Sequence, residues 1–237
     1  PQVKAASGSY RVVYPRGVKL AGLSFARVFN TVAVGSELSY RKGGALNATG
    51  VSALDDEGPR GDTIHFIANA VYGVPRNFIS ENATLVGEFA YSHLQRVTEH
   101  KELYKGAGTA ACTNGRTPGI PDSGSESDGC SSKNYYAVAV NYTPQYISIL
   151  PSWDLDVPLT VNYGLHGNAP TAGGGNEGAL SYSIGLKATY AQLYEFSLRY
   201  ADTKAQPKNL ANGSVAGNGP VGGTDRGWLA FTFKTSF

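Results

Sequence analysis

Apolar and polar side chains alternate along most of the chain in runs of about eight to twelve residues. The last run is the clearest: Leu229, Phe231 and Phe233 occupy odd positions, whereas Thr232 and Lys234 occupy even ones. A period of two residues is typical of a strand with one apolar face and one polar face. The alternation therefore predicts an all-β protein.

Similar alternating segments recur upstream, and together they predict about ten strands. The first two segments are the least regular. The later ones carry Tyr, Phe, Val and Leu at every second position, here called the apolar parity, and the positions between them form the polar parity. With their flanking residues, the strands reach the ~9–11 residues that a tilted strand needs to cross a bilayer. The expected strands cover residues 8–14, 19–28, 32–40, 64–72, 85–91, 136–142, 155–165, 180–190, 194–201 and 227–237.

The connections between these segments alternate in length. Going backward from the last strand, long and short connections follow one another at 203–224, 191–192, 167–178, 150–154, 97–132, 75–81, 42–61 and 30–31. Long loops at one end and short turns at the other are typical of an outer-membrane barrel, where every strand must be paired because lipid tolerates no free edge. We therefore expect residues 1–237 to form one domain, a transmembrane antiparallel up-and-down β-barrel.

Aromatic side chains also favour a membrane barrel. They lie towards the ends of the apolar parity, as the aromatic girdles of such barrels do. Members of this set are Tyr40, Tyr72, Tyr91, Tyr136, Tyr163, Tyr182, Tyr190, Tyr194, Tyr200 and Phe237. The alternative is a soluble β-sandwich in which the same residues form aromatic cross-strand pairs in the core.

Composition excludes several other classes. The chain is 41% hydrophobic and only 16% charged, with 30 Gly and 15 Tyr, which disfavours disorder and charge-rich helical bundles. Its apolar runs are too short for a ~20-residue spanning helix. A net charge of +2 without a basic run gives no reason to expect nucleic-acid binding. The first four residues do not lead into an apolar segment, so we expect no signal peptide within this sequence.

Two cysteines, Cys112 and Cys130, lie in one stretch rich in Gly, Ser and Asp. This arrangement favours a loop disulfide in an oxidising compartment over a metal site. Acidic residues between them include Glu126 and Asp128, but they lack the ordered pattern of an EF-hand. The four histidines show no metal spacing either. We therefore expect no metal and no cofactor, and a disulfide-bonded loop that folds inward and narrows a lumen.

The polar parity collects charged residues of both signs. Charged side chains are costly against lipid but can be solvated inside a barrel, so we expect these residues to face the lumen. Two interpretations are open: a hydrated pore, or an interior held together by ion pairs. The expected lumen-facing polar residues are Glu37, Arg41, His65, Glu88, Asp156, Lys187, Glu195, Arg199, Arg226 and Lys234.

Three stretches resemble a proteobacterial outer-membrane barrel family catalogued only as a domain of unknown function, number 1302. The matching stretches are 14–41, which includes Glu-Leu-Ser-Tyr-Arg, 161–168, and the terminal 225–237. Members of that family are typically about twice as long, so the resemblance implies that this chain is the carboxy-terminal half of a larger barrel. Phe231, Phe233 and Phe237 resemble the terminal signal that the barrel-assembly machinery recognises.

The same resemblance implies a bacterial outer-membrane location in contact with lipid and lipopolysaccharide. Family genes often neighbour those of a periplasmic lipid-carrier-like protein and an inner-membrane exporter, so the resemblance implies these two proteins as partners in the traffic of hydrophobic compounds. We therefore expect a porin-like channel or transport component of Gram-negative bacteria, and not an enzyme. The alternatives are a barrel enzyme using Asp55, Asp56 and His166, or a structural or adhesive surface protein using its cysteine-bearing loop.

Whether the barrel closes within this chain is a separate expectation. Ten strands are an even number, so they could close alone. If further strands complete the barrel instead, residues 8–14 will not pair with residues 226–237.

Overall fold

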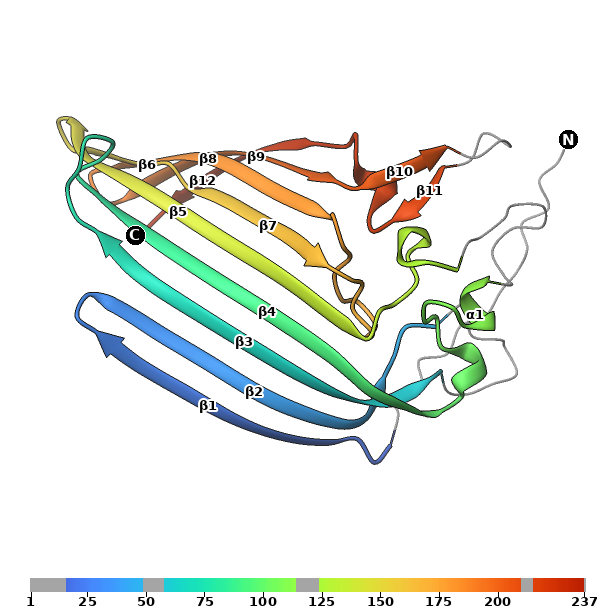
Figure 1. Cartoon of the computed structure of the whole chain (residues 1–237). Helices are drawn as coiled ribbons and strands as arrows, with labels where there is room; N and C mark the ends of the chain where they lie inside the picture. Colours follow the sequence, from blue (N-terminus) through green and yellow to red (C-terminus); the bar gives the residue numbers. More distant parts are fainter. Residues whose placement is uncertain (1–15, 49–57, 114–123, 210–214, 237) are drawn as a thin grey trace, which may run out of the picture.

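The computed structural model describes residues 16–48, 58–113, 124–209 and 215–236. A single 10-stranded antiparallel sheet dominates this part of the chain, and a separate two-stranded sheet lies at one end (Figure 1). Within these four ranges, helix is limited to one short α-helix and three 3₁₀ turns. The expected all-β antiparallel fold is therefore confirmed.

Five long strands form the first half of the sheet, and each pairs with the next. The longest has 18 residues, about three times the usual ~5–6. In chain order the strands are β1 (Lys19–Phe29), β2 (Val32–Ala45), β3 (Arg60–Val74), β4 (Asn82–Glu99) and β5 (Asn134–Leu150).

The second half begins with two short strands that share one place in the sheet. β6 (Trp153–Asp156) and β7 (Leu159–His166) both lie between β5 and β8. One continuous strand over 155–165 was wrong, because Pro158 has no backbone N–H to donate to the ladder. The sheet continues through β8 (Leu180–Tyr190) and β9 (Tyr194–Lys204) to β12 (Trp228–Thr235).

The long connections contain structure that the alternation did not predict. The connection that joins β9 to β12 along the chain contains a hairpin of β10 (Gln206–Asn209) and β11 (Val215–Asn218). The remaining elements are η1 (Lys101–Leu103), α1 (Ala110–Thr113), η2 (Glu126–Asp128) and η3 (Val221–Gly223). These elements are too short to show a hydrophobic period, so the sequence pattern cannot reveal them.

Long loops and short turns separate to opposite ends of the sheet, as expected (Figure 1). The short turns include Asn30, Ser152, Ala191 and Gln192, which all have positive φ angles. Left-handed residues of this kind reverse the chain within a tight hairpin. Because the strands are antiparallel, the four long connections then meet at the other end.

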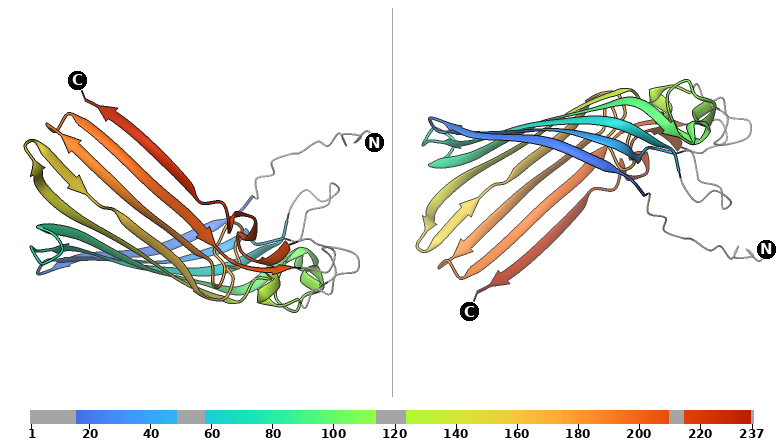
Figure 2. Two further views of the ribbon diagram at one scale, coloured as in Figure 1. Left: turned by 90° about the horizontal axis from the view of Figure 1, so that it is seen from above. Right: turned by 90° about the horizontal axis from the view of Figure 1, so that it is seen from below.

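Two edges of the sheet remain open among the described residues. β1 pairs only with β2, and β12 pairs only with β9. The sheet bends so that its second half turns away from the plane of β1 to β4, and the edge strands lie apart (Figure 2). Residues 8–14, expected as the first strand, lie outside the described residues.

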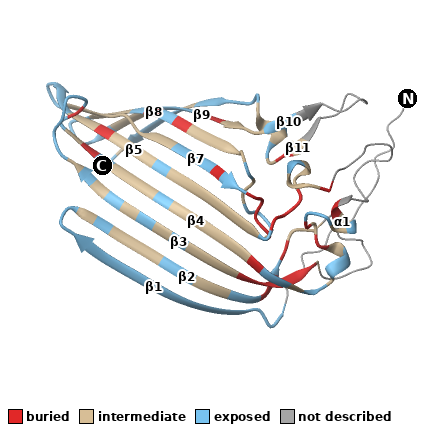
Figure 3. Cartoon of the chain, in the orientation of Figure 1, coloured by how far each residue is buried: buried red, intermediate tan, exposed pale blue. Residues whose placement is uncertain are grey.

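Burial is concentrated at the long-loop end (Figure 3). Leu46, Leu94 and Tyr104 form a small buried cluster there. Most strand residues are half-buried or exposed, including many large apolar ones. No described residues form a layer over either face of the sheet, and the packed core in this part of the chain lies under the loops.

Candidate functional site: the polar face and its loop cap

The pairing register carries each parity through the whole sheet, which gives it one apolar and one polar face. On the polar face, Asn69, Glu88 and Ala139 are direct neighbours across β3, β4 and β5. The same register brings all but one of the charged and histidine residues listed above onto this face. The exception, Arg226, precedes the first residue of β12 and belongs to no strand.

Opposite charges pair near the short-turn end of this face. Lys187 Nζ lies 2.6 Å from Asp156 Oδ2, and Lys234 Nζ lies 3.0 Å from Glu195 Oε1. Alternating charges therefore run across β6, β8, β9 and β12. Exposed pairs of this kind contribute little to stability, typically ~0–1 kcal/mol, but they leave the face without a strong net field at this end.

Other polar-face residues have partners of different kinds. The two ring nitrogens of His65 lie 2.8 Å from Ser92 Oγ and 2.9 Å from Thr63 Oγ1. The guanidinium of Arg199 lies 5.6 Å from the centre of the Trp228 ring, a cation–π distance. The interpretation of an interior held together by ion pairs thus applies to only part of this face.

A cavity of about 500 Å³ opens between the polar face and the loops above it. Its volume is in the range of small-molecule sites, ~300–1,000 Å³. The cavity, which we call the chamber, is lined on the strand side by Glu88, Ala90, Tyr135, Ala137, Asn162, Ser181 and Thr203, and on the loop side by Gly174, Gly175, Asn176 and Pro220.

Glycines allow the connection after β7 to fold back over the strands and roof the chamber. Gly164 donates its N–H to Ala179 O at 3.0 Å and accepts from Gly178 N at 2.9 Å. A Cβ at Gly164 would overlap Asn176 O, and one at Gly175 would overlap the Tyr135 hydroxyl. Gly164 requires glycine because the backbone of the returning connection approaches it too closely for any side chain, whereas at Gly175 the close atoms belong to the Tyr135 side chain.

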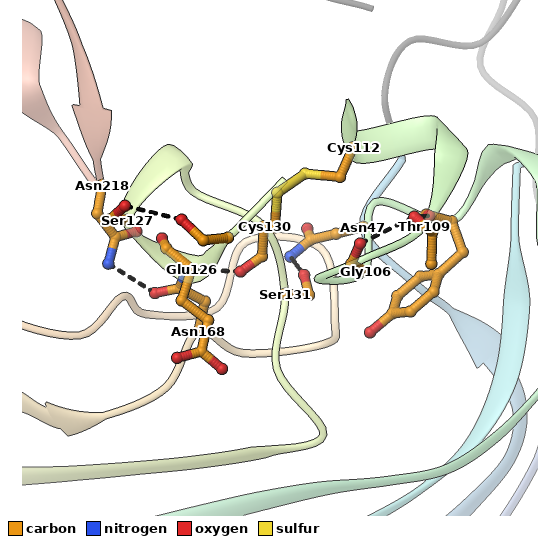
Figure 4. The surroundings of a disulfide bond; sticks show 12 residues. Asn47, Gly106, Thr109, Cys112, Glu126, Ser127, Cys130, Ser131, Asn168 and Asn218 are labelled. Carbon is orange, nitrogen blue, oxygen red and sulfur yellow. Dashed lines mark hydrogen bonds between the residues drawn. A yellow bond between two sulfur atoms is a disulfide. The ribbon is translucent and has the colours of Figure 1, made fainter. Parts of the chain in front are cut away.

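The long loops are joined into one structure, here called the loop cap, by the side chain of Asn168 (Figure 4). Asn168 is 1% exposed, and its Nδ2 donates to Glu126 O at 2.8 Å and to Cys130 O at 2.7 Å. Its Oδ1 accepts from Glu177 N at 3.0 Å and from Asn218 Nδ2 at 2.8 Å. One amide thus ties three connections together with every hydrogen-bonding group satisfied.

The fourth connection joins the cap through Asn47. Its Nδ2 donates to Ser131 Oγ at 3.0 Å and to Ala169 O at 2.8 Å. Next to Ser131, Cys130 forms the expected disulfide with Cys112 (Figure 4). Sequence reasoning missed Asn47, Ser131, Asn168 and Asn218 as a group, because isolated polar residues in loops carry no signal of burial.

A second polar cluster fixes the loop end of β2, β3 and β4. Asp62 is fully buried, and its carboxylate accepts from Gly43 N at 3.0 Å and from Arg96 Nε at 2.7 Å. Arg60 donates to Gly43 O at 3.0 Å and to Glu99 Oε2 at 3.2 Å. This cluster lies at the bulges where the strand register shifts, so it compensates backbone groups that the ladder leaves unpaired.

Aromatic side chains form a row at each end of the apolar face. At the loop end, Tyr91, Tyr136 and His166 stack in series. At the short-turn end, Trp153 packs on Tyr190 and Phe196, and Phe196 packs on Phe233. Tyr182 and Tyr190 mark the two rows on β8.

Charges on the apolar face lie outside the space between these rows, except on β1. From β2 to β12, the described strands carry no Asp, Glu, Lys or Arg on the apolar parity between the rows. Beyond the loop-end row, Asp202 accepts hydrogen bonds from the hydroxyls of Tyr182 and Tyr200 and pairs with Lys204 at 2.6 Å. On β1, Arg27 near the short turn lies 5.1 Å from the Phe29 ring centre.

The residues considered for catalysis do not form a described site. Asp55 and Asp56 lie outside the described residues. His166 Nδ1 lies 3.1 Å from Glu177 Oε2, which also accepts from Gly167 N. Within the described ranges, no three His, Cys, Asp or Glu side chains gather in a way that could hold a metal ion. Phe231 and Phe233 are exposed on the apolar parity of β12, and Phe237 is outside the described part.

Fold and site together define an all-β protein built on one large two-faced antiparallel sheet with a polar loop cap. No helix of the described residues has the length and apolar character needed to cross a membrane. A family model described as a protein of unknown function, DUF1302, matches residues 1–237, and the chain belongs to that family. Neither the curated proteins nor the solved structures contain a match.

Proposed function

We propose that this chain forms a β-barrel, or part of one, in a bacterial outer membrane and serves there as a channel for small solutes. The observation that carries the proposal is the segregation of the two faces. The eight crossings from β2 to β12, with β6 and β7 counted as one crossing, keep an apolar face without charge between two aromatic rows, whereas β1 carries Arg27 on this face. Such a face suits lipid, and the opposite one suits water.

The dimensions of the apolar face agree with this proposal. Tyr182 and Tyr190 are separated by eight residues, which is about 27 Å at ~3.4 Å per residue. A tilt of ~40° reduces this to about 20 Å along the membrane normal, close to the ~25 Å apolar band of outer-membrane barrels. Large side chains on this face, such as Leu198 at 41% exposure, would be costly to leave in water.

A pair of adjacent substitutions tests which face meets lipid. Leu198 lies on the apolar face and Ser197 on the polar face of β9. We expect Leu198→Arg to lower the free energy of unfolding in lipid vesicles by ~2–4 kcal/mol, as charges near the bilayer midplane do, and Ser197→Arg to have a much smaller effect. Equal effects of the two substitutions, or a monomer that is soluble without detergent, would contradict the membrane assignment.

Channel activity needs its own experiment. The full-length protein, reconstituted in planar bilayers, is expected to give single-channel conductance, and Leu198→Arg is expected to reduce the number of inserted channels rather than their conductance. Insertion without conductance or solute flux would reject the channel and leave a structural barrel.

A further inference from the structure

We propose that the chamber under the loop cap is a binding site for small hydroxylated organic cations, such as amino sugars. The inference goes beyond a channel, because it assigns a ligand class to one place on the polar face. It rests on the charge, the hydrogen-bonding groups and the shape of the lining.

The charge of the residues that line the chamber determines whether a cation or an anion binds. Among the described residues that line the chamber, Glu88 is the one carboxylate, and there is no Lys, Arg or His. The ion pairs of the polar face lie elsewhere, near the short-turn end. Glu88 is exposed to solvent, and its carboxylate attracts a cation and repels an anion.

Hydrogen-bonding groups form a row that suits hydroxyls. The strand pairing aligns Glu88, Asn162, Ser181 and Thr203 across β4, β5, β7, β8 and β9, with Ala139 between the first two. Asn162 Nδ2 donates to Ser181 Oγ at 3.1 Å. Amides and hydroxyls both donate and accept hydrogen bonds, so this row can donate to the hydroxyls of a ligand or accept from them.

Small residues leave the space for a ring. Ala90 on β4 pairs with Ala137 on β5, and Ala137 pairs in turn with Gly164 on β7. These three residues line the chamber beside the polar row. A six-membered sugar ring fits in about 500 Å³ with room for water.

The walls of the chamber are held in place before any ligand arrives. Asn176 Nδ2 donates to Asn218 Oδ1 at 2.9 Å, and Asn218 in turn donates to Asn168 Oδ1 at 2.8 Å. The roof is thus tied to the buried centre of the loop cap. A preformed site loses less conformational entropy on binding, which favours even a small ligand.

Three sugars of the same ring size and different charge test the proposal. Isothermal titration calorimetry would measure binding of D-glucosamine, D-glucose and D-glucuronate to the full-length protein in detergent. We expect glucosamine to bind at least fivefold more tightly than glucose, and glucuronate to bind most weakly. In Glu88→Gln, glucosamine and glucose are expected to bind within twofold of each other, whereas Glu88→Asp retains the preference.

Glu37→Gln is the matched control, because Glu37 lies on the polar face but does not line the chamber. It is expected to bind all three sugars as the unchanged protein does. Glucuronate binding as tightly as glucosamine, a preference that persists in Glu88→Gln, or no binding of any of the three at millimolar concentration would each overturn the proposal. The measurement does not depend on conduction, so a protein that binds glucosamine but conducts nothing would reject only the channel.

Discussion

Asn168 is a single side chain on which the loop cap depends. Its buried amide makes four hydrogen bonds that join three connections, and the bonds with Cys130 and Asn218 are fully buried. Replacing it with Ala leaves two carbonyls and two N–H donors without these partners. Each buried polar group left unpaired costs ~1–3 kcal/mol.

We expect Asn168→Ala to loosen the cap more than the sheet. Hydrogen exchange of the amides of Glu177 and Cys130 is expected to accelerate by at least tenfold, while exchange in the central strands changes little. Asn162→Ala is the control, since Asn162 is exposed and makes one side-chain bond. Equal acceleration in the two variants would contradict the role assigned to Asn168.

Tyr104 makes the cap sensitive to high pH. Burial raises the pKa of its phenol from the ordinary 10.0 to about 12, against a smaller lowering by a hydrogen bond with Ser131. Between these two values the unfolded chain loses the phenolic proton and the folded protein keeps it. The free energy of unfolding therefore falls as the pH rises through this window, by roughly 2–3 kcal/mol in total.

This effect is separated from other titrations by comparison with Tyr104→Phe, which has no phenolic proton. Thermal unfolding of both proteins between pH 9 and pH 12 is expected to show a steeper loss of stability in the unchanged protein. Parallel curves would show that Tyr104 ionises equally in the folded and unfolded states.

At the scale of elements, the roof over the chamber depends on Gly164, where a residue with a side chain would not fit. We expect Gly164→Ala to displace the connection after β7, because the added methyl would overlap Asn176 O. A thermal midpoint several degrees lower and faster proteolysis of residues 167–179 are expected. Gly87→Ala on β4 is the matched control, because a Cβ there has nothing within 4 Å.

The strands and turns are the elements that the sequence predicted best. Alternation is a period-two signal that is clear in the later long strands, so β8 and β9 begin at the expected residues 180 and 194. The break between β6 and β7 at Pro158 does not show in the alternation, because it depends on which residues have a backbone N–H to donate to the ladder. The hairpin of β10 and β11 was missed because its strands have only four residues each.

The polar face was predictable for the same reason, and the chamber was not. Parity alone puts Glu88 and Lys187 on one face of the sheet. It contains no information about Gly175 or Asn176, which reach the chamber only because a loop folds back over the strands. Contacts between residues distant in sequence, such as Asn47 with Ser131, depend on tertiary structure that a local pattern does not encode.

For the molecule as a whole, the direction of the edge strands limits how a barrel can close. The ten strands of the sheet make nine antiparallel crossings, because β6 and β7 together form one crossing. With an odd number of crossings, β1 and β12 run in the same direction. Pairing them directly would require one parallel ladder in an otherwise antiparallel sheet. An odd number of further strands, inserted between β1 and β12, would keep every pair antiparallel.

We therefore expect β1 and β12 to be separated by at least one strand in the assembled protein. Cysteines at Gly22 on β1 and Ala230 on β12 should not form a disulfide under oxidising conditions, because a disulfide needs a Cα separation below about 7 Å. Cysteines at Leu23 and Leu38, which face each other across β1 and β2, are the positive control, with both pairs read by mass spectrometry of the full-length protein in vesicles. Efficient cross-linking of Gly22→Cys to Ala230→Cys, or of pairs shifted by two residues along either edge, would instead show a barrel closed by a parallel pair, the arrangement that an odd strand number demands.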